Sequence, residues 1–242
     1  MKVGFIVDGQ AEYGSLGFLT ARIPVATGDT LGPIVYADLQ PTSPVEMLVS
    51  RCREEIDNVF AVKGVTRTVV LLDLDDRPVG CVRDWAMEFQ AVAQAGLGHL
   101  MPDGVYVVIK NACFENWLIS DYEALKGMAK FNLSAAHEAR IRSSADNVKA
   151  AEVIDASLRA AASANGRTYN YEKRSDSRAI LSVARPGFMA ENSRSFRRFL
   201  RVVGCTGYAE TAQSKSIIPA TDIPIVEASQ ARERTRLGRG RR

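Results

Sequence analysis

Short apolar runs that alternate with longer helical patterns constrain the fold of this chain more than any other feature. Runs rich in β-branched residues predict strands at 2–7, 33–37, 66–72 and 105–109. The intervening patterns predict helices at 12–22, 43–63, 81–95 and 114–129. Apolar strands separated by helices are typical of a largely parallel sheet that is covered on both faces. We therefore expect an α/β fold with a largely parallel sheet.

The helix expected at 43–63 carries start signals, with Ser43 as the N-cap, Pro44 at the first helical position and Glu46 three residues after the cap.

The second half of the chain is predicted to be mainly helical, with helices at 145–162 and 192–203. We expect three parts: an α/β core at 1–143, a helical extension packing on it at 144–203, and an irregular, flexible, Arg-rich tail at 204–242.

Composition excludes several classes of protein. Apolar residues make up 46% of the 242 residues, which is enough for a sizeable core. No segment approaches the roughly 20 apolar residues of a membrane helix, and no leader pattern opens the chain, so a cytoplasmic location is expected. The four cysteines form no CxxC pair and are predicted to be buried or free thiols. Only two histidines are present, which argues against zinc sites and histidine-based catalysis.

Charge is distributed unevenly along the chain. Residues 1–120 contain 9 Lys/Arg and 15 Asp/Glu, whereas residues 121–242 contain 22 and 13. An acidic half followed by a basic half fits a metal site paired with an anion-binding surface. The alternative is a basic tail on an ordinary domain, because the last twelve residues alone contain six arginines.

Carboxylates follow the predicted strands at one edge of the sheet. Asp8 follows the first strand, Asp73 and Asp75 follow the third, and Glu115 begins the helix after the fourth. Ligands of such sheets gather beyond the carboxyl ends of the strands. Clustered carboxylates need a cation, and Mg²⁺ prefers oxygen ligands. The alternative is that each acid caps a helix or lies in a solvated loop, as we expect for Asp76.

Several segments resemble a known family. VGFIVDGQAEYGSL is similar to the opening of TOPRIM-like proteins, and VVLLDLDD resembles the DxD strand of the same fold. FENWLISD resembles the E-x-W-L-x-x-D signature of uncharacterised TOPRIM-like proteins from bacterial defence islands. YEKRSDSRAIL and SRSFRRFLRVV look like later segments of that family, so the resemblance spans roughly residues 1–203.

The resemblance implies a TOPRIM-like, Rossmannoid parallel sheet flanked by helices, with a helical C-terminal part. It also implies metal-dependent phosphodiester chemistry like that of overcoming-lysogenization-defect nucleases. It implies Mg²⁺ or Mn²⁺ as the cofactor, nucleic acid as a partner, and an ATPase partner in an anti-phage system. By this match Asp8, Glu12, Asp73 and Asp75 are the metal and catalytic candidates, and Glu115 is a further metal candidate. Classical TOPRIM sequences carry Glu at the position of Asp8, where it serves as a metal ligand or as a general acid or base. In this chain Glu12 could take over that role.

Residues of the signature helix also have structural interpretations. We expect Trp117 to be a core residue and Asp121 to be a cap or an ion-pair partner.

Basic residues of the second half are candidates for phosphate binding. Lys173 could stabilise transition-state charge or be an ordinary surface lysine. Arginines recur at i, i+3, i+4 and i+7 on one face of the helix at 192–203, opposite an aromatic face. That stripe would bind nucleic acid or be merely solvated; its members are Arg194, Arg197, Arg198 and Arg201.

We therefore expect a Mg²⁺-dependent nuclease, the effector of a defence system. The alternative is a non-catalytic partner or regulatory subunit of a defence ATPase with a degenerate site. IVDG also resembles a segment of PIN-like ribonucleases, but the FENWLISD match argues against that family. DLDD resembles the motif of haloacid-dehalogenase phosphatases, but in that family the motif ends the first strand, whereas here it follows the third.

Overall fold

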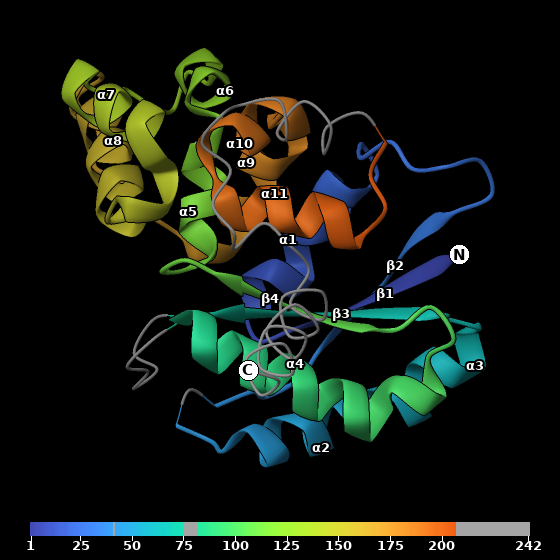
Figure 1. The fold of residues 1–242 in the computed structure, drawn as a ribbon. Helices are drawn as coiled ribbons and strands as arrows, with labels where there is room; N and C mark the ends of the chain where they lie inside the picture. Colours follow the sequence, from blue (N-terminus) through green and yellow to red (C-terminus); the bar gives the residue numbers. More distant parts are fainter. Residues whose placement is uncertain (41, 75–81, 207–242) are drawn as a thin grey trace, which may run out of the picture.

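The computed structural model describes residues 1–40, 42–74 and 82–206. Its centre is a four-stranded sheet in the order β2-β1-β3-β4, in which all strand pairs are parallel (Figure 1). The strands are β1 (Lys2–Val7), β2 (Thr30–Tyr36), β3 (Arg67–Asp73) and β4 (Val105–Lys110). The predicted α/β fold is confirmed, and each predicted strand overlaps an observed one.

The register of the strands brings their carboxyl ends to one edge of the sheet. Val7, the last residue of β1, pairs with Tyr36 of β2 and with Leu71 of β3. Asp73, the last residue of β3, pairs with Lys110, the last residue of β4. Residues at and just after these strand ends are therefore neighbours in space.

Helices cover both faces of the sheet, as Figure 1 shows. In β3, Val69 and Leu71 pack into the core of one face, and Val70 and Leu72 pack into the core of the other. This alternation is the period of two that a strand imposes.

The first face carries α1 (Gln10–Thr20), α5 (Phe114–Ser120), α9 (Lys173–Val183), α10 (Pro186–Asn192) and α11 (Arg194–Val202). Further from the sheet on the same side lie α6 (Tyr122–Gly127), α7 (Ala135–Ser144), the 3₁₀ turn η3 (Ala145–Asn147) and α8 (Ala150–Ala164). The opposite face carries α2 (Val45–Glu55), the π-helical turn η1 (Ile56–Phe60), α3 (Ala61–Lys63) and α4 (Val82–Leu97), followed by the 3₁₀ turn η2 (Gly98–Leu100).

Three helix predictions differ from the structure in detail. The helix expected at 145–162 is the 3₁₀ turn η3 followed, after Val148 and Lys149, by α8. The helix expected at 43–63 begins at Val45, so Pro44 rather than Ser43 occupies the cap position, and no side chain caps it. The helix expected at 114–129 is interrupted at Asp121, whose backbone is not helical. The Asp121 carboxylate accepts the N–H of Ala124 and binds Arg185, and these contacts start α6 as a new helix.

The C-terminal part is helical, as expected, and shares a core with the sheet. Trp117 of α5 is fully buried and packs its ring 5.1 Å from Phe196 and 5.0 Å from Phe199, between ring centroids. Its Nε1–H donates to Ser195 at 2.8 Å. Trp117 is therefore a core residue, as predicted.

The division into three parts stays a prediction, and most of the predicted tail lies outside the described residues.

Among the described cysteines, Cys52 and Cys205 are buried and Cys113 is half-buried. None of the described helices has the length and apolar character that a membrane crossing requires.

Candidate metal centre

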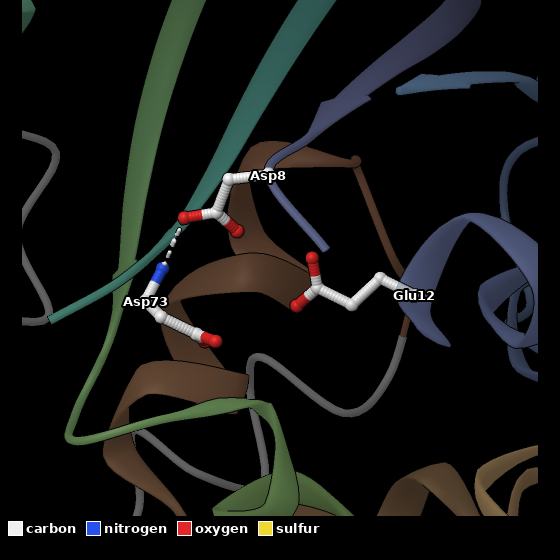
Figure 2. Close-up of side chains that lie close together, drawn as sticks. All are labelled: Asp8, Glu12 and Asp73. Carbon is white, nitrogen blue, oxygen red and sulfur yellow. Dashed lines mark hydrogen bonds between the residues drawn. The ribbon is translucent and has the colours of Figure 1, made fainter. Parts of the chain in front are cut away.

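Three carboxylates converge at the carboxyl edge of the sheet. Asp8 directly follows β1, Glu12 lies in the first turn of α1, and Asp73 ends β3. Each offers one oxygen, and the three oxygens lie within 4.8 Å of one another (Figure 2). The Asp73 backbone N–H donates to Asp8 Oδ2 at 2.9 Å, which ties the ends of the two strands together. The predicted convergence of Asp8 and Asp73 is therefore observed.

The turn between β1 and α1 makes room for Glu12. Gly9 is the N-cap of α1 in an extended conformation, and it provides no side-chain cap. A Cβ on Gly9 would lie 3.3 Å from Glu12 Oε2. The absence of that Cβ lets the Glu12 carboxylate point back toward the strand ends, as Figure 2 shows.

A buried lysine that the sequence analysis missed completes the cluster. Lys110 ends β4 and is fully buried. Its Nζ contacts Glu12 Oε1, Asp73 Oδ1 at 2.9 Å and Asp8 Oδ1 at 3.3 Å. The sequence shows only a lysine at the end of an otherwise apolar strand, and the pairing of β4 with β3 is what places it beside Asp73.

Burial and neighbouring charges shift the pKa values of both Glu12 and Lys110. Burial raises the pKa of Glu12 well above its usual value; Lys110 opposes this rise, and Asp73 and Asp8 add to it. Burial alone would lower the pKa of Lys110, but the charges of Asp73, Asp8 and Glu12 outweigh it and raise that pKa. Lys110 is therefore firmly protonated, whereas Glu12 resists ionisation.

The residues present fit a divalent cation. Glu12 Oε2 is buried and accepts no hydrogen bond from any described group, although Oε1 contacts Lys110. When all three acids are ionised their charges repel one another, and a divalent ion bound between them would reduce that repulsion. A set of oxygen ligands favours Mg²⁺ or Mn²⁺ over metals that prefer sulfur or nitrogen ligands. No ion is identified, and Asp75, the remaining sequence candidate of this edge, lies outside the described residues.

Glu115 takes part in a neighbouring interaction rather than in the group of three. Its carboxylate binds Lys173 Nζ at 3.1 Å and accepts from the Tyr171 hydroxyl at 3.3 Å. Burial alone would lower the pKa of Lys173, but Glu115, with a smaller effect of Asp73, raises it. Lys173, whose side chain is half exposed, therefore lies within electrostatic reach of the carboxylate cluster.

The arginines of α11 do not form one solvated stripe. Arg198 is buried, and its guanidinium donates to the Val107 carbonyl of β4. Arg197 Nη1 donates to the Ala190 carbonyl at the end of α10, at 2.7 Å. Arg194 is exposed and Arg201 is half-buried. The aromatic face of the helix is in the core, as predicted, whereas two of its arginines bind backbone carbonyls inside the protein.

Comparison with known proteins identifies a family. The family described as a domain of unknown function (DUF4276) matches residues 18–203, which include Asp73 and Lys110. No curated protein and no solved structure matches the chain significantly.

Proposed function

We propose that this chain, which belongs to the DUF4276 family, is a metal-dependent enzyme that hydrolyses phosphodiester bonds in nucleic acid. One observation carries the proposal: carboxylate oxygens of Asp8, Glu12 and Asp73 lie within 4.8 Å of one another at the carboxyl edge of a parallel sheet. This edge is where open α/β sheets bind their ligands. The parallel order β2-β1-β3-β4 is consistent with the TOPRIM-like fold implied by the sequence resemblance.

The roles of the residues follow from their contacts. Asp8, Glu12 and Asp73 would hold a Mg²⁺ or Mn²⁺ ion. That ion would activate a water molecule and neutralise charge on the phosphate. Lys110 keeps the three carboxylates together by compensating part of their charge. Lys173, half exposed beside the cluster, would position a phosphate oxygen of the substrate.

The biological setting is part of the proposal and rests on the sequence resemblance alone. In this setting the chain is the effector of an anti-phage defence system and acts with an ATPase partner.

The test is a cleavage assay with purified full-length protein. Labelled single-stranded DNA, duplex DNA and RNA are incubated with Mg²⁺, with Mn²⁺ or with EDTA. We expect metal-dependent cleavage that Asp73→Asn abolishes, because the substitution removes a ligand charge while keeping side-chain size. Asp57→Asn is the matched control, since Asp57 is exposed on the opposite face of the sheet. Cleavage that survives EDTA, or that Asp73→Asn leaves intact, contradicts the proposal.

A second function is favoured by one observation. The Lys110 ammonium already contacts all three carboxylates, so it could serve as their permanent counterion. The chain would then be a non-catalytic partner or regulatory subunit of an ATPase. Calorimetry distinguishes the two functions: a lack of Mn²⁺ binding, together with a stable complex with the ATPase, would support this second one.

A further inference from the structure

Two helices lie side by side and run in the same direction away from the carboxylate cluster. A Cβ on Gly14 of α1 would lie 3.5 Å from Arg174 Nε of α9. One turn further, the Arg178 guanidinium lies 4.7 Å from the Phe18 ring centroid. The residue numbers rise together along both helices, which makes α1 and α9 parallel neighbours.

Both helices begin at the candidate metal centre. Glu12 in the first turn of α1 belongs to the cluster itself. Lys173 is the first residue of α9, and Asp73 contributes to the rise of its pKa. The outer face of the pair therefore starts at the cluster and extends for about 16 Å, the length of an eleven-residue helix.

Within the two helices the exposed charges are positive, and the exposed Glu172 precedes them as the N-cap of α9. Arg174 and Arg178 are exposed on α9. The carboxylates within the two helices are Glu12 and Asp176, and both are about 1% exposed. Asp176 is moreover paired with Lys130 at 2.6 Å. The face is therefore suited to a polyanion.

Aromatic rings are exposed on α1, one of them beside an arginine of α9. Tyr13 is 49% exposed and Phe18 is 37% exposed, both on α1. Because five residues separate them, the two rings lie roughly 140° apart around α1. Gly14, over which the Arg174 side chain packs, and the exposed Gly17 lie between them. Exposed rings beside arginines are the combination that proteins use to bind unpaired bases and phosphates together.

We propose that the outer face of α1 and α9 binds single-stranded nucleic acid and leads it to the carboxylate cluster; the second half of this statement rests on the proposed function. Arg174 and Arg178 bind phosphates through their guanidinium groups. Tyr13 and Phe18 stack on bases, which must be unpaired to expose a ring face. This face takes the role that the sequence suggested for α11, where Arg197 and Arg198 bind backbone carbonyls instead.

The experiment measures binding rather than cleavage. Fluorescence anisotropy of a labelled oligothymidylate is recorded with the full chain in EDTA, so that no metal-dependent reaction takes place. The test variant is Arg174→Glu/Arg178→Glu. The matched control is Arg51→Glu/Arg159→Glu, which changes net charge equally at exposed arginines on other helices. Both variants retain the Arg-rich C-terminal segment, so its attraction for polyanions is common to them.

The test variant should bind roughly tenfold or more weakly than the control. The slope of log affinity against log salt concentration should fall by about 1.4, because each phosphate contact with a single strand contributes about 0.7. Phe18→Ala should weaken binding without changing that slope, since stacking releases no counterions. Circular dichroism melting verifies that each variant is folded.

Three results would overturn the proposal. The first is equal weakening of binding by both charge variants, and the second is duplex DNA that binds as tightly as the single strand. The third is unchanged binding by the double variant Tyr13→Ala/Phe18→Ala. The outcome is separable from that of the proposed function. Tight, arginine-dependent binding without metal-dependent cleavage supports this surface and contradicts the enzyme, whereas cleavage with normal binding by the arginine variant does the reverse.

Discussion

Replacement of the buried lysine, Lys110→Met, tests how the carboxylate cluster is held together. Methionine keeps the length and apolar stem of the side chain and removes only the charge. The lost ammonium contacts Asp73 at 2.9 Å and Asp8 at 3.3 Å, and also contacts Glu12. At an effective dielectric constant of about 20, one ion pair at about 3 Å is worth roughly 5 kcal/mol before desolvation.

Desolvation of the lysine offsets part of this attraction, so the net loss is smaller than the sum of the pairs. Removing one partner of a buried ion pair typically costs about 3–5 kcal/mol, since the remaining charge is left uncompensated. We expect a loss of that size in the free energy of unfolding of Lys110→Met, measured by urea titration at pH 8 without divalent metal. Lys149→Met is the control, because its ion pair with Glu152 is exposed, and it should change little.

Two additions sharpen the measurement. The double variant Glu12→Gln/Lys110→Met removes one charge of each sign and should recover most of the loss. Mg²⁺ should also restore stability to Lys110→Met, by about 2.7 kcal/mol at a free concentration of about 100 times its Kd. Lys110→Met that is as stable as the wild type at pH 8 without metal would refute the reasoning.

The pH dependence of the same variant has a definite sign. Burial already raises the pKa of Glu12, and removal of Lys110 takes away the group that opposes this rise. An acid whose folded pKa lies above its unfolded pKa binds more protons in the folded state between these two values. The stability of Lys110→Met should therefore fall as the pH rises through the folded pKa of Glu12, and over a wider pH range than in the wild type.

Other substitutions and modifications test the surrounding structure. Trp117→Ala should lower the free energy of unfolding by about 3–5 kcal/mol, because it empties the space between two aromatic rings of the core; chemical denaturation measures this. Asp121→Ala should cost about 1–3 kcal/mol in the same assay, since it removes the cap of α6 and the partner of Arg185, whereas Asp121→Asn should cost less. Burial raises the pKa of the Cys52 thiol to about 12. Iodoacetamide at pH 8 should therefore alkylate the half-buried Cys113 well before Cys52, and mass spectrometry of the labelled protein measures the order.

The sheet and part of the site could be predicted because they depend on local patterns. Apolar β-branched runs defined the four strands, and the position of Asp8 and Asp73 just at the strand ends placed them at one edge. Glu12 entered through the family resemblance rather than through the strand-end argument, because it belongs to a helix.

Lys110 could not be assigned without the topology. Only the pairing of β4 with β3 places Lys110 beside Asp73, and strand order is a long-range property that the local pattern does not contain.

Helix α9 escaped prediction because polar residues occupy part of its buried face. Asp176 and Ser177 point inward with Ile180 and Leu181, so apolar residues alone do not show the helical period. The partners that permit this burial, Lys130 for Asp176 among them, come from distant parts of the chain. The face formed by α1 and α9 was therefore not visible in the sequence.

Calorimetric titration of the full chain with Mn²⁺ tests the metal centre most directly, because it does not depend on substrate or partner. We predict saturable binding that Asp73→Asn and Glu12→Gln each weaken by roughly tenfold or more, as even the loss of a group that only supports a metal ligand costs about that much. Asp57→Asn should bind Mn²⁺ like the wild type. A wild-type chain that binds no Mn²⁺, or binding that neither cluster variant weakens, would contradict a metal site at Asp8, Glu12 and Asp73.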